Sequence, residues 1–271
     1  LSTFFQSWLD QKSDLQKDMG LSHSVHDYRK LVNCWRHLTK VNSMKCEKFY
    51  IHNDLPVYQI SNYLVSSART CLYISTGIHG DEPAPCWAVL EWANENQNLL
   101  NHIPVVIFPC LNPWGFINNC RNDRNGDDLN RVWGNRDHPL INLVFARIGY
   151  LTFSLSLNLH EDFDANGIYL YEPYSGGRND TWAEKVLSAG KKFLPIDDRR
   201  TIDGRTAKNG IIRPRINNPP KDGYPEALYF ANLRSTRNFT LETPSEESFN
   251  DRSKALQVMI EQGVKLAFSN K

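Results

Sequence analysis

A histidine and a carboxylate lie three positions apart where an apolar stretch of the chain ends. The stretch is residues 71–78, His79 and Glu82 follow it, and a second histidine, His160, ends another apolar stretch at residues 155–159. Two histidines and one carboxylate form a ligand set for zinc that leaves a fourth position for water. An open position distinguishes catalytic from structural zinc, so these residues predict a hydrolytic zinc site.

The His-x-x-Glu spacing is a weak signal by itself. The chain has eight histidines, and most histidines in proteins lie at the surface or are hydrogen-bonded in the core. The context strengthens the prediction, because His79 and His160 each come directly after an expected strand. Ligands in open α/β sheets bind beyond the carboxyl ends of the strands, so we expect His79, Glu82 and His160 to share one crevice.

Two further segments carry side chains suited to substrate chemistry. Arg121, Asn130 and Arg131 lie in a turn-rich segment after a strand at residues 105–108. The planar fork of arginine suits bidentate binding of a carboxylate, although a solvated loop would carry the same residue types. Glu242 ends an apolar strand. Beside a zinc-bound water it could act as a general base, and otherwise it would cap the next helix.

An α/β framework is predicted to position these residues. Strands are expected at residues 57–60, 71–76 and 105–108, with a helix at 87–93 that two prolines, Pro83 and Pro85, can initiate. Strand, helix and strand at this spacing form a βαβ unit, which predicts a largely parallel sheet covered by helices. Further strands are expected at 151–159, 168–171 and 238–241, and an amphipathic helix at 248–268.

We predict one domain over residues 1–271. Residues 1–48 are expected to form a helical lead-in that packs on the main body, because their apolar positions recur at roughly helical spacing. Residues 199–225 are rich in Gly, Pro, Asn and Arg and predict a long irregular loop, which often borders a site. Four basic residues in this segment either favour an acidic substrate or form a solvated surface: Arg205, Lys208, Arg213 and Arg215.

Composition argues against several classes of partner. With 31 basic and 30 acidic residues, the chain has no general attraction to nucleic acid or to an anionic membrane. No apolar stretch approaches the ~20 residues of a membrane span, and the first residues do not resemble a secretion signal. The six cysteines are scattered without a CxxC pair, which predicts reduced thiols and a cytoplasmic location.

Taken together, the segments resemble the zinc carboxypeptidases of the carboxypeptidase A type, in particular their compact bacterial members. The resemblance runs from about residue 72 to residue 245 through four motifs: His79-Gly80-Asp81-Glu82, Asn112-Pro113-Trp114-Gly115, Asp128-Leu129-Asn130-Arg131 and Leu241-Glu242-Thr243-Pro244. Four spaced motifs in one order are far more specific than any one alone. The family implies a three-layer α/β/α fold with a mixed, mostly parallel central sheet.

The resemblance also implies a role for each residue of the metal centre. His79, Glu82 and His160 would bind one zinc ion per chain, and Glu242 would take the place of the general base. The physical logic agrees, because zinc lowers the pKa of its bound water and a nearby carboxylate can accept the proton.

The residues that would hold the substrate follow from the same resemblance. Arg121 would polarise the scissile carbonyl, and Asn130 with Arg131 would bind the terminal carboxylate of the substrate. The family's mobile tyrosine has no secure match, and of two candidates Tyr224 is preferred to Tyr229.

The implied activity is that of a zinc metallocarboxypeptidase, which hydrolyses the C-terminal amide bond of a small peptide. A second interpretation is a zinc deacylase that acts on N-acyl amino acids such as succinylglutamate or acetylaspartate. The enzymes of that group share the His-x-x-Glu spacing, the Asp-Leu-Asn-Arg motif and the later histidine. Residues 241–245 look more like the peptidase branch. Either substrate would be small and carry a free carboxylate. A third interpretation is a binding module that has lost catalysis. Such a module would lack a metal-ligating residue or the general base, and this chain has His79, Glu82, His160 and Glu242.

The sequence leaves three questions open. It does not choose the substrate side chain or the oligomeric state. It also leaves room for a second metal, because four further carboxylates lie near the motifs: Asp81, Asp127, Asp128 and Glu161.

Overall fold

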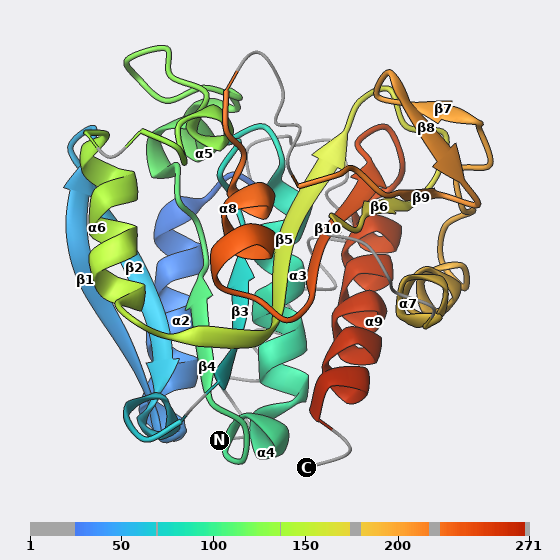
Figure 1. Cartoon of the computed structure of the whole chain (residues 1–271). Helices are drawn as coiled ribbons and strands as arrows, with labels where there is room; N and C mark the ends of the chain where they lie inside the picture. The colour runs from blue at the N-terminus through green and yellow to red at the C-terminus, as the bar shows by residue number, and fades with distance from the viewer. Residues whose placement is uncertain (1–24, 69, 136, 174–179, 217–222, 269–271) are drawn as a thin grey trace.

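A ten-stranded sheet runs through the centre of the molecule (Figure 1). The computed structural model describes residues 25–68, 70–135, 137–173, 180–216 and 223–268. Within this part of the chain the strand order is β1-β2-β4-β3-β5-β10-β6-β9-β8-β7. The strands are β1 Met44–His52, β2 Leu55–Asn62, β3 Thr70–Ser75, β4 Val105–Phe108, β5 Thr152–Asp162, β6 Tyr169–Tyr171, β7 Thr201–Ile202, β8 Arg205–Lys208, β9 Ile211–Ile212 and β10 Asn238–Pro244.

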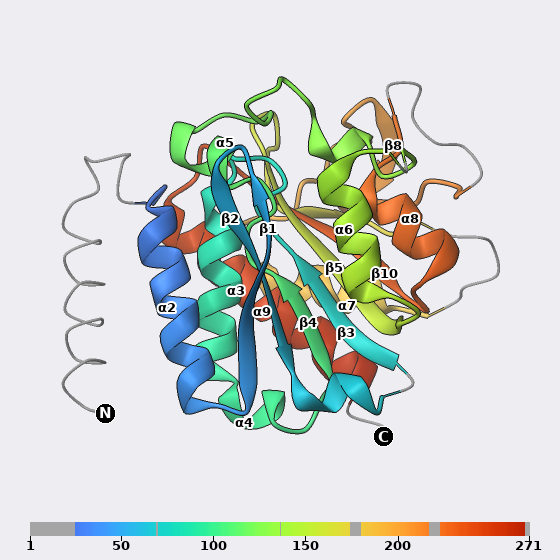
Figure 2. The same cartoon turned by 90° about the vertical axis from the view of Figure 1, so that its left-hand side faces the viewer.

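Helices cover both faces of the sheet. The helices are α2 Tyr28–Val41, α3 Pro83–Glu95, α4 Gln97–Leu100, α5 Pro113–Asn118, α6 Pro139–Ile148, α7 Trp182–Gly190, α8 Glu226–Leu233 and α9 Phe249–Phe268, with 3-10 turns η1 Tyr63–Ser66 and η2 Leu129–Arg131. One face carries α2, α3, α7 and α9 over the larger apolar core, and the other carries α6 and α8 over a second core (Figure 2). The predicted three-layer α/β/α class is therefore confirmed.

The prediction that the sheet is mostly parallel is wrong. The four central strands β4, β3, β5 and β10 are parallel, but over the described residues the sheet has four parallel and five antiparallel neighbouring pairs. Every residue of β4 and β10 is buried, as expected of strands covered on both faces. The antiparallel pairs lie toward the two ends of the sheet, and three of them, β1–β2, β7–β8 and β8–β9, join strands that are consecutive in the chain.

Tight hairpins account for much of this antiparallel content. The turns Asp203-Gly204 and Asn209-Gly210 connect β7 to β8 and β8 to β9, and all four residues have positive φ. Asp-Gly and Asn-Gly favour this two-residue turn because both positions tolerate the left-handed region. The prediction of an irregular loop is therefore wrong for residues 201–212, whereas residues 217–222 of that segment lie outside the described residues.

A single amphipathic helix forms most of the described part of the expected lead-in. Asp27 caps α2, its side chain accepting from the Lys30 N–H at 2.8 Å. Leu31, Trp35 and Leu38 recur at helical spacing and are buried in the larger core. Residues 44–48 belong to strand β1 instead, and residues 1–24 lie outside the described part of the chain.

The predicted motifs gather at the carboxyl ends of the central strands. In the parallel register of β10 and β5, Glu242 lies beside His160, and β3 ends at Ser75 beside Asn158. The chain then turns through His79 into α3, whose first residue is Pro83. One edge of the sheet therefore holds all of the residues that the sequence singled out as metal donors.

Two further sequence expectations can be compared with the structure. All six cysteines lie in described segments and carry free thiols, as expected. None of the helices in the described ranges is long and apolar enough to cross a bilayer.

Candidate active site

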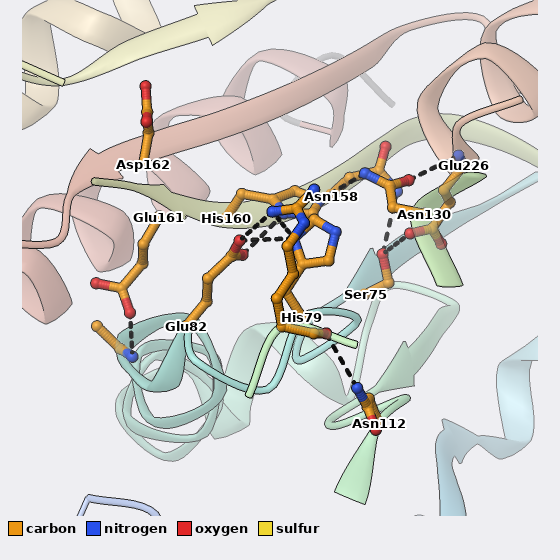
Figure 3. A network of polar contacts seen from close by, with 12 residues as sticks. Ser75, His79, Glu82, Asn112, Asn130, Asn158, His160, Glu161, Asp162 and Glu226 are labelled. Atoms are coloured by element: carbon orange, nitrogen blue, oxygen red, sulfur yellow. Dashed lines mark hydrogen bonds and ion pairs between the residues drawn. The ribbon is translucent and has the colours of Figure 1, made fainter. Parts of the chain in front are cut away.

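Three donor groups converge where β3, α3 and β5 meet (Figure 3). His79 Nδ1 lies 2.6 Å from Glu82 Oε1, and His160 Nδ1 lies 2.8 Å from Glu82 Oε2. The Glu82 carboxylate thus sits between two imidazoles whose ring centroids are 4.9 Å apart. All three residues are buried, and one ligand atom from each lies within 4.8 Å of the others. The sequence prediction that these residues share one crevice is confirmed.

Local backbone structure explains how Glu82 reaches both histidines. Glu82 is the N-cap residue of α3, but its side chain makes no capping hydrogen bond. Its carboxylate is therefore free to face the cavity. Gly80 permits the tight turn before it: a Cβ there would lie 1.9 Å from the carbonyl carbon of Gly115, so only glycine fits this approach.

Asp128 orients His79 from the opposite side of the ring. His79 Nε2 lies 3.1 Å from Asp128 Oδ1, so a proton on Nε2 would be donated to the carboxylate and the Nδ1 lone pair would face Glu82 and His160. A carboxylate behind a histidine ligand fixes the tautomer in this way. From the sequence Asp128 is predicted only as a candidate for a second metal, and this role was not predicted, although the residue belongs to the Asp-Leu-Asn-Arg motif.

Opposite charges control the protonation of these groups. Burial raises the pKa of Glu82, but His79 and His160 outweigh burial and hold it well below its ordinary value. Burial lowers the pKa of His79, yet Glu82 and Asp128 together raise it to about 9. In the metal-free protein a proton therefore supplies positive charge between these carboxylates. A divalent cation would compete with it for the same donors.

Glu242 faces the same cavity from β10. Its side chain is 8% exposed, and it neighbours His160 across the β5–β10 ladder. Burial raises the pKa of Glu242 well above its ordinary value, with His160 opposing and Glu82 and Asp162 adding to the rise. A carboxylate with a raised pKa is suited to accept a proton near neutral pH.

The two predicted arginines and Asn130 also line the cavity. Arg121 holds Asp128 Oδ2 through Nε and Nη2, at 3.2 and 3.0 Å, and its side chain is 44% exposed. The side-chain oxygen of Asn130 accepts from the Glu226 N–H at 3.0 Å, and its Nδ2 lies 3.5 Å from His160 Nε2. The structure therefore brings all of these residues to the metal donors.

Tyr224 is not brought to the cavity. Its backbone pairs with the strand-like segment at Val132, and its N–H donates to the Arg131 carbonyl at 2.7 Å. Its ring packs with the second apolar core. The alternative, Tyr229, is buried in that core and stacks on Phe145.

The tyrosines that do line the cavity are Tyr169 and Tyr171 of β6. Their hydroxyls donate to Asp162 Oδ2 at 2.8 Å and to Asp203 Oδ2 at 2.6 Å. The sequence predicted this strand but not its part in the site. The available signal was that positions 169 and 171 share one face of a strand.

Glu161 and Asp162, which follow His160, have separate roles. Glu161 accepts from the Ala84 N–H at 2.9 Å and pairs with Arg252, so it fastens the start of α3 to β5 and α9. Asp162 accepts from Tyr169. Neither belongs to the group of convergent metal donors.

The cavity has a volume of about 350 Å³, which lies within the range of small-molecule sites. Its lining comes from segments far apart in the chain: His79, Glu82, Arg121, Asn130, Arg131, His160, Glu161, Asp162, Tyr169, Tyr171, Pro173, Asp203, Arg205, Pro214, Pro225, Ala227, Leu228, Thr240 and Glu242. Arg205, one of the four basic residues singled out in the sequence, is therefore a cavity residue.

Comparison with known sequences gives one partial match. Residues 68–146 match the family model of the succinylglutamate desuccinylase/aspartoacylase catalytic domain. The matched segment contains His79, Glu82, Arg121, Asn130 and Arg131. No curated protein matches the chain.

Comparison with solved structures extends over most of the chain. A candidate metallopeptidase from Shewanella denitrificans is 19% identical, with a TM-score of 0.79 over 90% of this chain and 91% of its own. A metallo-carboxypeptidase from Burkholderia cenocepacia is 16% identical, with a TM-score of 0.63 over 90% of this chain and 69% of its own. Carboxypeptidase A from Helicoverpa armigera is 15% identical, with a TM-score of 0.64 over 97% of this chain and 80% of its own.

At these identities the similarity is one of fold. Together with the convergent donor group and the matched segment, it confirms the resemblance inferred from the four motifs. The chain has the zinc-carboxypeptidase-like fold, and a His-Glu-His group able to hold a metal lies at the carboxyl edge of its sheet.

Proposed function

We propose that this protein is a zinc-dependent hydrolase that cleaves an amide bond near a free carboxylate of a small substrate. The supporting observation is the convergence of the donor group, a buried glutamate and two arginines on one cavity of about 350 Å³. A metal donor set, a proton acceptor and carboxylate-binding groups are the parts that such a reaction requires.

The donor set fits zinc. His79 and His160 offer Nδ1 and Glu82 offers its carboxylate, which is the two-histidine, one-carboxylate set of catalytic zinc. When bound, zinc would supply Lewis acidity and lower the pKa of a water in its open position toward ~7.

Glu242 would serve as the proton acceptor. It lies on the strand next to His160, it is buried, and its raised pKa lets it hold a proton and return it to the leaving amine. Burial also keeps bulk water away from the carboxylate, so the proton stays in the cavity.

Arg121, Asn130 and Arg131 would bind and orient the substrate. Arg131 donates from Nη1 to the carbonyl of Asn130 at 3.1 Å, which keeps its guanidinium beside the cavity. Arg121 lies between Asp128 and the donor group, 3.8 Å from Glu82 Oε1, where it can stabilise negative charge that develops on the substrate. The positive groups would select a substrate with a free carboxylate.

Two substrate classes are consistent with this geometry. The first is a short peptide that loses its C-terminal residue, as in a metallocarboxypeptidase, and the structural similarity to carboxypeptidases supports it. The second is an N-acyl amino acid, and the match of residues 68–146 to a desuccinylase/aspartoacylase model supports it. Both substrates present an amide bond next to a carboxylate, so they share one mechanism.

A matched substrate panel would test the proposal. The panel would contain dipeptides, their C-terminal amides, and N-acetyl and N-succinyl amino acids, with products identified by mass spectrometry. We expect zinc-loaded wild type to hydrolyse one class with a free carboxylate, to spare the amides, and to lose this activity in Glu242→Gln. Hydrolysis of amides as fast as of acids, or full activity in Glu242→Gln, would contradict the proposal.

A further inference from the structure

We propose that the chain holds a second divalent transition metal, of the zinc class, at a cluster separate from the active-site cavity. The cluster consists of His52, Asp123, Asp127 and His138. His52 is the last residue of β1, the two aspartates belong to the loop between α5 and η2, and His138 precedes α6. None of the four lines the active-site cavity.

The ligand atoms of this cluster are close together. One ligand atom each from Asp123, Asp127 and His138 lies within 4.8 Å of the others. His52 Nε2 lies 2.9 Å from Asp123 Oδ2, His138 Nε2 lies 4.0 Å from Asp127 Oδ2, and the two rings are 6.2 Å apart. Small side-chain movements would bring such a set onto one ion.

His52 carries the observation that points to a ligand. It is only 6% exposed, and its Nε2 has no hydrogen-bond partner among the described residues. Its close polar neighbour is Asp123 Oδ2, an ion-pair partner at 2.9 Å that belongs to the same cluster. A buried nitrogen without a hydrogen bond is destabilising, and a metal bound at Nε2 would give this nitrogen a partner.

The loop directs the second oxygen of Asp123 toward the same point. Oδ1 of Asp123 accepts from the backbone N–H groups of Asn125 and Asp127, at 2.8 and 3.0 Å. These bonds hold the carboxylate, which is 2% exposed, with Oδ2 toward His52. Asp127 is exposed and offers a route for an ion from solvent.

The donor types select the metal. Two imidazoles and two carboxylates suit zinc and similar transition metals, whereas calcium and magnesium prefer sites made of oxygen alone.

The second cluster lies next to an active-site residue in the chain. Asp127 immediately precedes Asp128, which holds His79 and Arg121. A metal at the second site would therefore fasten the loop that carries active-site residues to β1 and α6.

Binding has one identifiable cost. His138 Nδ1 accepts a long hydrogen bond, 3.4 Å, from the Ile141 N–H at the start of α6. Ligation through Nε2 would move the ring proton to Nδ1, and this capping bond would be lost. Asparagine is also a good N-cap residue, so His138→Asn removes the metal ligand while leaving α6 capped.

Cobalt binding to a variant without the first site tests the proposal. The starting protein is His79→Ala/His160→Ala, prepared metal-free, with its fold checked by circular dichroism. We expect it to bind one equivalent of Co²⁺ with visible absorption bands of a low-symmetry site, and not to bind Ca²⁺ there. Adding His138→Asn should weaken Co²⁺ binding by more than about 100-fold. Loss of a residue that only supports a metal ligand weakens binding by up to about 100-fold, and loss of a direct ligand should exceed this. His102→Ala, which replaces an exposed histidine, should leave Co²⁺ binding unchanged.

Absence of Co²⁺ binding in the folded double variant would overturn the proposal, as would unchanged binding after His138→Asn. If the double variant does not fold, zinc content is compared in the wild type and in His138→Asn. Two equivalents that fall to one support the second site, and equal content in the two proteins contradicts it. Neither result depends on whether the protein hydrolyses any substrate.

Discussion

Asp128 links the metal donors to Arg121, the residue predicted to polarise the substrate carbonyl. It accepts from His79 Nε2 on one oxygen and from Arg121 on the other. Replacement by asparagine keeps the shape but removes the charge that favours the Nε2 proton. We predict that Asp128→Asn lowers the affinity of the His79–Glu82–His160 group for zinc by about 10- to 100-fold. Competition with a chelator would measure this, and Asp137→Asn, an exposed change, is the control. An unchanged affinity would show that Asp128 does not orient His79.

Glu242 is predicted to act on protons and not to bind the metal. Glu242→Gln should therefore retain zinc while reducing kcat by about 10²–10⁴-fold, the usual contribution of a general base. Steady-state kinetics together with metal analysis would separate the two effects. Loss of zinc in this variant would instead assign Glu242 to the donor group.

Arg131 is predicted to bind the substrate carboxylate in the ground state as well as in the transition state. Arg131→Ala should raise KM by at least about 10-fold with a smaller change in kcat, as expected when uniform binding is removed. Arg124→Ala is a suitable control, because Arg124 pairs with the exposed Asp54 outside the cavity. A fall in kcat alone, at unchanged KM, would argue against carboxylate recognition by Arg131.

At the scale of elements, helix α8 inserts a carboxyl group into the sheet. Glu226, its first residue, accepts from the Tyr73 hydroxyl at 2.5 Å and the Ser75 hydroxyl at 2.9 Å, and its backbone N–H holds Asn130. Burial raises the pKa of Glu226 to about 7, although these hydroxyls oppose the rise. The carboxyl is therefore neutral in the folded protein over a range of pH where it is ionised in the unfolded chain.

The sign of the resulting pH dependence is fixed by this raised pKa. Between the ordinary value of 4.5 and about 7 the folded state binds more protons, so the free energy of unfolding falls as pH rises through this window. The loss attributable to Glu226 is on the order of 3 kcal/mol. Glu226→Gln cannot ionise, so we predict that its stability relative to wild type increases from pH 5 to pH 8. Urea unfolding at both pH values would measure this, and a constant difference would contradict the assignment.

The connections between elements explain where sequence reasoning succeeded and failed. Strands β3 and β4 coincide with continuous apolar runs, and β5 and β10 with alternating apolar positions. Both patterns are visible without a structure. The strands β7 and β9 contain two residues each, too few to show a period, and only their Asp-Gly and Asn-Gly turns could have predicted them. The antiparallel end of the sheet formed by β7, β8 and β9 was missed for this reason.

Some residues of the candidate site could be predicted from the sequence, and others could not. His79, Glu82, Arg121, Asn130 and Arg131 lie within one segment of the chain and were identified from spacing and resemblance. Tyr224 and Tyr229 both lie at plausible sequence distances before Glu242, whereas a backbone pairing with residues 131–133 decides where Tyr224 lies. Tyr169 and Tyr171 enter the cavity because β6 lies beside β10 in the sheet. Asp203, in the β7–β8 turn, also lines the cavity and accepts from the Tyr171 hydroxyl at 2.6 Å. The order of the strands in the sheet, which brings these residues to the site, is not visible in a local sequence pattern.

At the scale of the whole molecule, the account depends on one cavity assembled at the carboxyl edge of a three-layer fold. Helices on both faces bury the central strands, and this burial fixes the relative positions of His160 and Glu242 on β5 and β10. The donor group and the residues proposed to bind the substrate carboxylate are thereby held by buried elements of the fold, as a preorganised site requires.

The most direct test of this account is a zinc titration of chelated protein in which bound metal and hydrolysis are followed together, with wild type beside His160→Ala. We predict that chelated wild type is inactive, that zinc restores hydrolysis of a substrate with a free carboxylate, and that His160→Ala stays inactive at every zinc concentration at which wild type is saturated. Full activity in the chelated protein, or in His160→Ala, would contradict catalysis at the His79–Glu82–His160 group.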